Sequence, residues 1–137
     1  MATPFEALQS LIRVRISAAD AHYGGGLVDG ARVLALFGDA VTEVLIRFDG
    51  DEGLMRAYSE VEFTAPVRAG DYLEVRARLE EVGHTSRRVR CTAHKVIALD
   101  SPDGSAASVL REPQLVARAL AIAVVAEDRQ RKRAPSA

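Results

Sequence analysis

A chain of 137 residues with a formal net charge of −1 is long enough for one folded domain, and it has no overall field that would attract nucleic acid or an acidic membrane surface. Its 48% apolar and 27% charged residues are ordinary for a globular protein. The first ten residues lack the features of a secretory signal, and no apolar run is long enough to cross a bilayer. We therefore expect a cytoplasmic protein. Cys91 is the only cysteine, which excludes an intrachain disulfide and a cysteine-based metal cage.

The N-terminal part of the chain predicts a strand, a glycine-rich loop and one long helix. Residues 11–16 (LIRVRI) alternate between apolar and charged side chains, which is typical of a half-buried strand. The loop at residues 21–26 (AHYGGG) ends in three glycines, which sustain neither regular structure. Asp29 stands where a helix N-cap is expected, and apolar residues then recur at helical spacing from Val33 to Leu45. They cover most of the circumference, so we expect a helix packed on several sides.

Four strands are predicted after the helix. They span residues 54–63, 73–80, 85–99 and 115–127. A loop tip is expected at residues 100–108. Strands joined by short turns form an antiparallel sheet, and a single helix must cover one of its faces. We therefore predict an α+β protein with the hotdog fold, a curved antiparallel sheet wrapped around one long central helix. The domain is expected to span residues 1–127 and to be followed by a polar, disordered tail at 128–137.

The start of the helix is the first candidate site. Backbone N–H groups in the first helical turn, here at Gly30, have no partner within the helix, and the helix dipole adds partial positive charge. Because Gly25 and Gly26 precede this turn, a phosphate or the oxygen of a thioester enolate could approach the main chain closely. The glycine run matches neither the P-loop nor the dinucleotide-binding fingerprint, so a tight surface loop explains it equally well.

Two acids on the helix form the second candidate site. Asp39 and Glu43 are one helical turn apart and share a face. Their neighbours are apolar, so we expect at least one carboxylate to be enclosed, as in a tuned acid–base pair. A cation in the same pocket would instead keep both carboxylates ionised, and on an exposed face the two would be an ordinary solvated pair.

Further candidates lie in the loop and at the start of a later strand. His22 and Tyr23 precede the glycines, where side chains can point into a pocket, although His22 could equally hold a structural hydrogen bond. Ser86, Arg87 and Arg88 could hold a phosphate, but neighbouring strand residues face opposite ways, so at most one arginine faces a given ligand. A solvated strand edge is the alternative. No histidine has metal-ligand partners at a recognisable spacing, so no metal site is expected.

The chain resembles a known family in two long stretches. The β-aminoacyl-CoA ammonia-lyases, which act on 3-aminobutyryl-CoA or β-alanyl-CoA in amino-acid fermentation, are similar to DAHYGGGLVDGARVLALFGDAVTEVLIRFDGDEGL and to AYSEVEFTAPVRAGDYLEVRARLEEVG. The resemblance spans about residues 12–98, and it is specific in DAHY, LVDGAR, FGD-x-x-TE and EF-x-APV-x-AGD. Members of the family carry Asn where this chain has Gly26.

The resemblance implies a hotdog dimer with active sites between the helix of one subunit and the strands of its neighbour, and assembly of such dimers into hexamers. It implies an acyl-CoA substrate and ammonia as partners. No cofactor is expected, since CoA is part of the substrate. The substrate- and CoA-binding candidates are Asp29, Gly25, Gly26, Ser86, Arg87 and Arg88.

Ammonia elimination requires a base for the α-proton, a holder for the enolate oxygen and a group that recognises the amine. The amine is already protonated, so no strong general acid is required. Our hypothesis assigns the oxygen to the N–H of Gly30 and its neighbours. Asp39 and Glu43 would share the roles of base and ammonium holder, in an order left open, and His22 and Tyr23 would line the acyl pocket.

Two other functions are compatible with the sequence. The pattern EFTAPVRAGD…VGHTS also resembles the acyl-CoA thioesterase branch of the hotdog superfamily, in which an acid on the same helix would activate water. Asp39 is shifted by about two positions from the helix acid of those thioesterases. A non-catalytic acyl-CoA-binding protein is the third reading, and it would normally need a partner domain.

Overall fold

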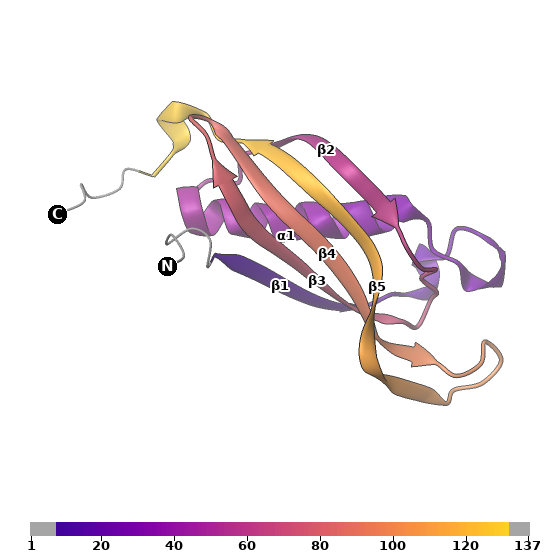
Figure 1. The fold of residues 1–137 in the computed structure, drawn as a ribbon. Helices are drawn as coiled ribbons and strands as arrows, with labels where there is room; N and C mark the ends of the chain where they lie inside the picture. Colours follow the sequence, from indigo (N-terminus) through magenta and orange to yellow (C-terminus); the bar gives the residue numbers. More distant parts are fainter. Residues whose placement is uncertain (1–7, 132–137) are drawn as a thin grey trace.

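A computed structural model describes residues 8–131 of the chain (Figure 1). The strands are β1 (Gln9–Arg15), β2 (Leu54–Phe63), β3 (Tyr72–Val82), β4 (Ser86–Leu99) and β5 (Ala107–Val124). The long helix is α1 (Gly30–Asp49), and short 3-10 turns are η1 (Ala18–Asp20), η2 (Gly24–Gly26) and η3 (Glu127–Arg129). Among the described residues, no helix is long and apolar enough to pass through a membrane. The predicted order of one strand, one long helix and four strands is confirmed.

The strands form one antiparallel sheet in the order β1-β3-β4-β5-β2. The helix α1 lies along one face of this sheet (Figure 1). Apolar side chains from the helix and the sheet meet between the two layers. Fully buried members of this core include Phe37, Val44, Val75, Cys91 and Ala119. One helix enclosed by a curved antiparallel sheet is the hotdog arrangement, so the predicted α+β fold is confirmed.

The helix α1 is covered on its sheet side and open on the other. It begins after Asp29 and ends at Gly50, whose φ of 74° is left-handed and whose N–H donates to the carbonyl of Ile46 at 2.9 Å. Its buried residues follow the helical period. Ala35 and Asp39 lie on the opposite side and are exposed. The expectation of a helix packed on several sides is therefore not met within one chain.

The edge strand β2 contains a bulge that changes which residues face the helix. Before the bulge, the hydroxyl of Tyr58 donates to the carbonyl of Leu34 in α1 at 3.0 Å. The pairing with β5 then shifts by one residue, and Glu60 has a φ of 53°. Because an extra residue reverses the alternation of side chains, Phe63 lies against the start of α1.

The strands β4 and β5 continue into a hairpin that projects beyond the other strands (Figure 1). The strand β5 begins at Ala107, well before the predicted residue 115. Its first residues pair with the end of β4, and an irregular stretch separates them from the rest of the strand. The register jumps there from Lys95–Gln114 to Ile97–Val109. Pro113 lies in the unpaired stretch of β5, where its missing N–H costs no ladder hydrogen bond.

The last described residues return to the end of α1. After η3, the N–H of Arg131 donates to the carbonyl of Asp49 at 2.8 Å. Residues 128–131 therefore continue the folded domain, and the predicted start of a disordered tail at residue 128 is wrong. Residues 132–137 lie outside the described residues, so the prediction stays untested there.

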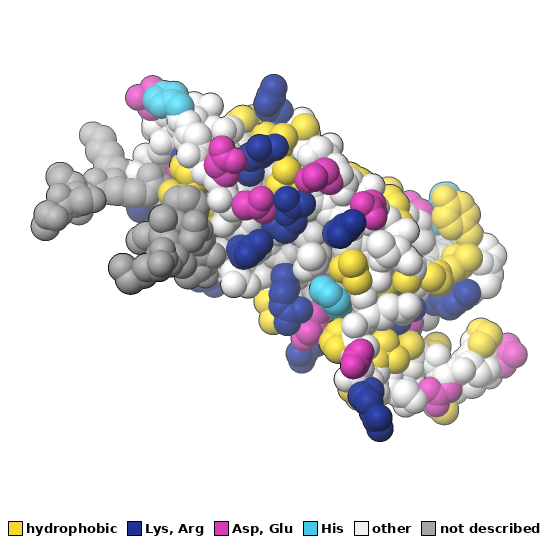
Figure 2. Space-filling view, in the orientation of Figure 1, with side chains coloured by type: hydrophobic (Ala, Val, Ile, Leu, Met, Phe, Trp, Pro, Cys, Tyr) yellow, Lys and Arg dark blue, Asp and Glu magenta, His cyan; other side chains and the backbone are white. Residues whose placement is uncertain are grey.

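The face of the sheet away from α1 carries charges of both signs (Figure 2). Its ion pairs include Arg90–Glu80 at 3.0 Å, Arg90–Glu60 at 3.1 Å, Arg118–Glu62 at 2.9 Å and Arg88–Glu81 at 3.7 Å. Exposed pairs of this kind each contribute about 0–1 kcal/mol to stability. Because the signs alternate, this face has no field of one sign that would attract a polyanion.

Candidate active site at the start of the helix

The glycine-rich loop is folded back on itself. The N–H groups of His22 and Tyr23 both donate to the carbonyl of Leu27, at 2.9 and 3.0 Å. Gly25 and Gly26 have φ values of 73° and 76°, in the left-handed region that favours glycine. The consecutive glycines are therefore required by the shape of the loop itself, which ends where α1 begins.

Arg68 joins this loop to the turn between β2 and β3. Its guanidinium Nη1 donates to the carbonyl of Gly25 at 3.2 Å, and its backbone N–H donates to the carboxylate of Asp71 at 2.8 Å. Asp71 is buried and lies 3.1 Å from the ammonium of Lys95. The stretch APVRAGD thus builds the turn that supports the loop. Gly25 and Gly26 border a pocket of about 630 Å³ beside Arg68, and their contact with a substrate stays a prediction.

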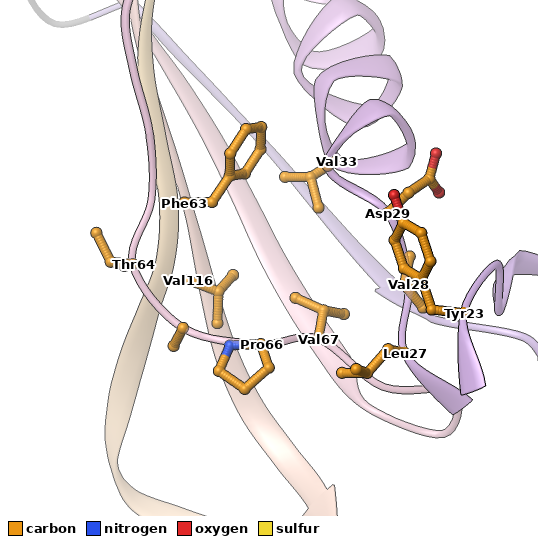
Figure 3. A pocket seen from close by; sticks show the side chains of 12 residues that line it. Tyr23, Leu27, Val28, Asp29, Val33, Phe63, Thr64, Pro66, Val67 and Val116 are labelled. Carbon is orange, nitrogen blue, oxygen red and sulfur yellow. The ribbon is translucent and has the colours of Figure 1, made fainter. Parts of the chain in front are cut away.

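A pocket of about 450 Å³ opens at the start of α1 (Figure 3). Its apolar walls include Leu27, Val28, Val33, Phe63, Pro66, Val67 and Val116. Gly30, the first residue of the helix, also borders it, and N–H groups of a first helical turn have no intrahelical partner. A pocket with apolar walls and main-chain donors suits the acyl end of a thioester, because the hydrocarbon packs on the walls and the oxygen accepts hydrogen bonds.

Two further predicted residues reach this pocket, and one does not. Tyr23 and Asp29 border it from the side of the loop, across from the end of β2 (Figure 3). Asp29 occupies the N-cap position, but its carboxylate makes no capping hydrogen bond, contrary to expectation. His22 is exposed, and its ring packs edge-on against Tyr23 with 4.8 Å between the ring centroids. Within one chain His22 does not border this pocket, and its contact with an acyl group stays a prediction.

The two helix acids lie on the open side of α1. Asp39 is exposed, and the partly exposed Glu43 has its Oε2 2.8 Å from Nε of Arg47. Within one chain the predicted enclosure is wrong, because the apolar neighbours point toward the sheet while the acids point away from it. Asp39 lies about 13 Å along the helix axis from Gly30, at 1.5 Å per residue. Neither acid is part of the pocket at the start of its own helix.

Tyr58 of β2 lies beside this acidic face and was not singled out by the sequence patterns. A side chain at Gly38 would meet its hydroxyl at 3.7 Å, so Tyr58 packs against the middle of the helix. Burial raises the pKa of Tyr58 to about 12, with smaller contributions from Cys91 and Asp39. The phenol therefore stays a neutral hydrogen-bond donor to Leu34. The alternation of side chains along the predicted strand could have shown that Tyr58 faces the helix.

The predicted phosphate-binding group lies near the opposite end of α1. Arg87 is fully buried, and its guanidinium is held by the carboxylate of Asp49 at 2.9 and 3.0 Å. The prediction that Arg87 binds CoA is therefore wrong. Arg88 lies on the outer face of the sheet, and Ser86 follows the turn before β4. Their contact with CoA stays a prediction.

Residues 8–131 contain no group of three or more His, Cys, Asp or Glu side chains arranged to hold a metal ion. Cys91 is buried in the core, and burial raises the pKa of its thiol to about 12. It has neither the exposure nor the thiolate character of a nucleophile.

Comparison with known proteins places this geometry in a family. Residues 25–96, more than half of the chain, match the model of the Thioesterase superfamily. A 3-aminobutyryl-CoA ammonia lyase of Acetoanaerobium sticklandii is 55% identical over 126 residues, which cover 91% of this chain and 100% of that protein. This chain belongs to the β-aminoacyl-CoA ammonia-lyases of the thioesterase superfamily.

Solved structures agree with this assignment. The β-alanyl-CoA:ammonia lyase of Clostridium propionicum matches with a TM-score of 0.87 and 36% identity, over 90% of this chain and 88% of that chain. A hexameric hotdog fold thioesterase of Campylobacter jejuni matches with a TM-score of 0.68 and 20% identity, over 88% of this chain and 86% of that one. At that identity the second match shows the fold alone. The predicted family is confirmed by the two lyases.

Proposed function

We propose that this protein catalyses the reversible elimination of ammonia from a short β-aminoacyl-CoA, as in the conversion of 3-aminobutyryl-CoA to crotonyl-CoA. The observation that carries the proposal is the 55% identity to the lyase of Acetoanaerobium sticklandii over that protein's whole length. The similarity to the lyase of Clostridium propionicum makes β-alanyl-CoA, which would give acryloyl-CoA, the other acyl group to test.

The pocket at the start of α1 supports this chemistry. The thioester oxygen would accept a hydrogen bond from the N–H of Gly30, where the helix dipole stabilises the negative charge of an enolate. A carboxylate removes the α-proton, and the electron pair of that C–H bond forms the carbon–carbon double bond. The C–N bond breaks with its pair on nitrogen. Because the departing group is already an ammonium, it leaves as ammonia without a general acid.

The position of the acids supports a site shared between two subunits. Asp39 and Glu43 face away from the pocket of their own chain. The nearby edge strand β2 exposes Leu54 and Met55, and the end of α1 exposes Ile46, an apolar surface of the kind that a partner covers. We therefore propose a homodimer in which the acids of one subunit act on a substrate held at the helix start of the other. One acid would be the base and the other would hold the ammonium.

The reaction is tested with crotonyl-CoA and ammonia, followed by NMR or mass spectrometry. Addition of ammonia across the double bond is the expected result. Release of free CoA would instead identify a thioesterase. Binding of the thioester with neither product would identify a non-catalytic acyl-CoA-binding protein.

The assignment of the acids is tested by substitution. Asp39→Asn and Glu43→Gln should each lower turnover by about two to four powers of ten, the usual contribution of a positioned proton-transfer group. Asp103→Asn, on the exposed tip of the β4–β5 hairpin, is the matched control and should keep full turnover. Near-normal turnover in both helix variants would remove the acids from the mechanism.

The shared site is tested by mixing two inactive variants. Gly30→Pro removes the N–H at the first helical position, and it is made together with Phe63→Ala because a Cβ at Gly30 would come within 2.5 Å of the Phe63 ring; Asp39→Asn removes the acid. In a mixed dimer, one site would carry both defects and the other neither, so activity should return when the two proteins are unfolded and refolded together. No return of activity would place both residues in a site within one chain.

We also propose that dimers assemble into a hexamer, the state named for the thioesterase of Campylobacter jejuni, and that the protein is cytoplasmic. Light scattering on the purified protein measures the assembly, and cell fractionation measures the location. The reaction as written needs no metal or organic cofactor, so turnover should survive extensive dialysis against EDTA.

A further inference from the structure

Phe63, the last residue of β2, lies directly against the first residue of α1. A Cβ atom built on Gly30 would come within 2.5 Å of Cζ and 2.7 Å of Cε1 of the Phe63 ring, so the ring packs on the bare main chain of Gly30. Phe63 nevertheless keeps 53% of its surface exposed. The ring is therefore not a core residue; it forms one wall of the open pocket at the helix start (Figure 3).

The bulge in β2 is what brings the ring to this place. Upstream of it, Tyr58 faces α1, and regular alternation would turn position 63 away from the helix. The extra residue at Glu60 restores the inward direction for Phe63 and directs Glu62 outward, where it pairs with Arg118 at 2.9 Å. Glu60 holds a left-handed φ of 53°, which is uncommon for a residue other than glycine.

The neighbours of the ring define what it would touch in a bound thioester. Val33 of the helix and Val116 of β5 line the same pocket, and Gly30 offers the main-chain donor for the thioester oxygen. An acyl chain that extends from the carbon bearing this oxygen would be bounded by the apolar side chains of Val33 in the helix and Val116 in the sheet. Tyr23 and Phe63 are both large and exposed, so either can be trimmed without emptying the core, and Phe63 is the one whose ring lies against Gly30.

We propose that Phe63 is a specificity-determining residue that limits the length of the acyl group accepted at the helix start. The inference rests on the proposed function in that it places the acyl group of the CoA thioester in this pocket. Shortening the side chain opens space beside Gly30 for additional methylene groups. One methylene in an apolar pocket typically changes selectivity by about 10- to 200-fold.

The test compares ammonia addition to crotonyl-CoA and to trans-2-hexenoyl-CoA in the wild type, Phe63→Leu and Phe63→Ala. The ratio of kcat/KM for the six-carbon over the four-carbon substrate should rise about tenfold or more in Phe63→Ala and less in Phe63→Leu. Val61→Ala, in the same strand but outside the pocket lining, is the control and should leave the ratio unchanged. An unchanged ratio in both Phe63 variants would overturn the proposal.

A binding measurement separates this proposal from the proposed reaction. Calorimetry with the saturated, unreactive butyryl-CoA and hexanoyl-CoA gives the same comparison without turnover, and Phe63→Leu serves if Phe63→Ala does not fold. A wild type that adds no ammonia, together with a shifted Kd ratio in the variants, would reject the lyase and keep the pocket assignment. Normal ammonia addition with no shift in either ratio would reject the role of Phe63 alone.

Discussion

Arg87 and Asp49 form a two-pronged ion pair in the interior of the protein. The Nε and Nη2 atoms of Arg87 donate to the two carboxylate oxygens of Asp49 at 2.9 and 3.0 Å, and both side chains are essentially without exposed surface. Nη1 donates to the carbonyl of Gly83 at 2.9 Å, and the guanidinium lies 5.4 Å from the ring centre of Phe48. The pair ties the end of α1 to the start of β4.

Loss of the guanidinium should be costly because it removes the positive charge that Arg87 places beside a buried carboxylate. Arg87→Met is expected to lower the free energy of unfolding by about 3–5 kcal/mol, and Arg87→Lys by less, since Lys keeps the charge but not the fork. Arg88→Met, on the outer face, is the control and should change it by no more than about 1 kcal/mol. Urea denaturation measures all three. Equal losses at positions 87 and 88 would show that the buried pair does not stabilise the fold.

Cys91 should be chemically silent while the protein is folded. Its side chain is buried in the core, and burial raises the pKa of the thiol from 9.0 to about 12. At pH 8 a thiol reagent such as DTNB should therefore react only as fast as the protein unfolds, and denaturant should restore the rate of a free thiol. Rapid labelling without denaturant would mean that β4 opens locally.

Glu74 should make stability depend on pH on the acid side. A hydrogen bond from Nε of Arg13, at 3.0 Å, is the main cause that lowers the pKa of Glu74 below 4.5, and the charges of Arg13 and Arg76 add to it. Because the pKa is lower in the folded protein than in the unfolded chain, the ionised carboxylate stabilises the fold at a pH above the unfolded pKa. This stabilisation is lost as the pH falls through the folded pKa. Glu74→Gln should thus be less stable than the wild type at pH 7 and equal to it in strong acid. If the stability difference between Glu74→Gln and the wild type were the same at pH 7 and in strong acid, the lowered pKa of Glu74 would not contribute to stability.

Position 26 should accept asparagine better than alanine. Gly26 has a φ of 76°, and no atom lies within 4 Å of a Cβ built there, so only backbone strain opposes a side chain. Gly26→Ala should cost about 1–2 kcal/mol of unfolding free energy, and Gly26→Asn less, because Asn adopts the left-handed region more readily. Thermal unfolding compares the two. An equal loss of stability in both variants would mean that something other than backbone conformation opposes a side chain at position 26.

The parts of the fold that follow from local patterns could be predicted from the sequence. The bounds of β2 at residues 54–63 agree with the prediction, and apolar spacing located α1 and its buried side. The burial of Arg87 could have been predicted in the same way, because Arg87 lies on the same face of the strand as Val89 and Cys91, which both face the core. Its charge suggested a ligand, while its position in the strand indicated burial.

The candidate site depended on information that local patterns do not contain. The helical period of α1 indicates which side faces the sheet but not what, if anything, covers the other side, so it could not place Asp39 and Glu43. Phe63 reaches the helix start only because the bulge at Glu60 reverses the alternation of β2. A one-residue irregularity has no strong compositional signal, so strand patterns alone direct the ring to the wrong side.

The projecting tip of the β4–β5 hairpin gives the protein a region that can vary without loss of the fold. Beyond Ile97, Ala98 and Leu99 form strand pairs with Ser108 and Ala107 alone, although the Leu99 side chain lies against Gly70, so opening the tip beyond Leu99 breaks no strand pairing with β1, β2 or β3. Two strands held only by each other are marginally stable. Amide hydrogens there should exchange with solvent long before that of Cys91. Evolution can therefore lengthen, shorten or redecorate this tip while the helix start and its pocket keep their shape.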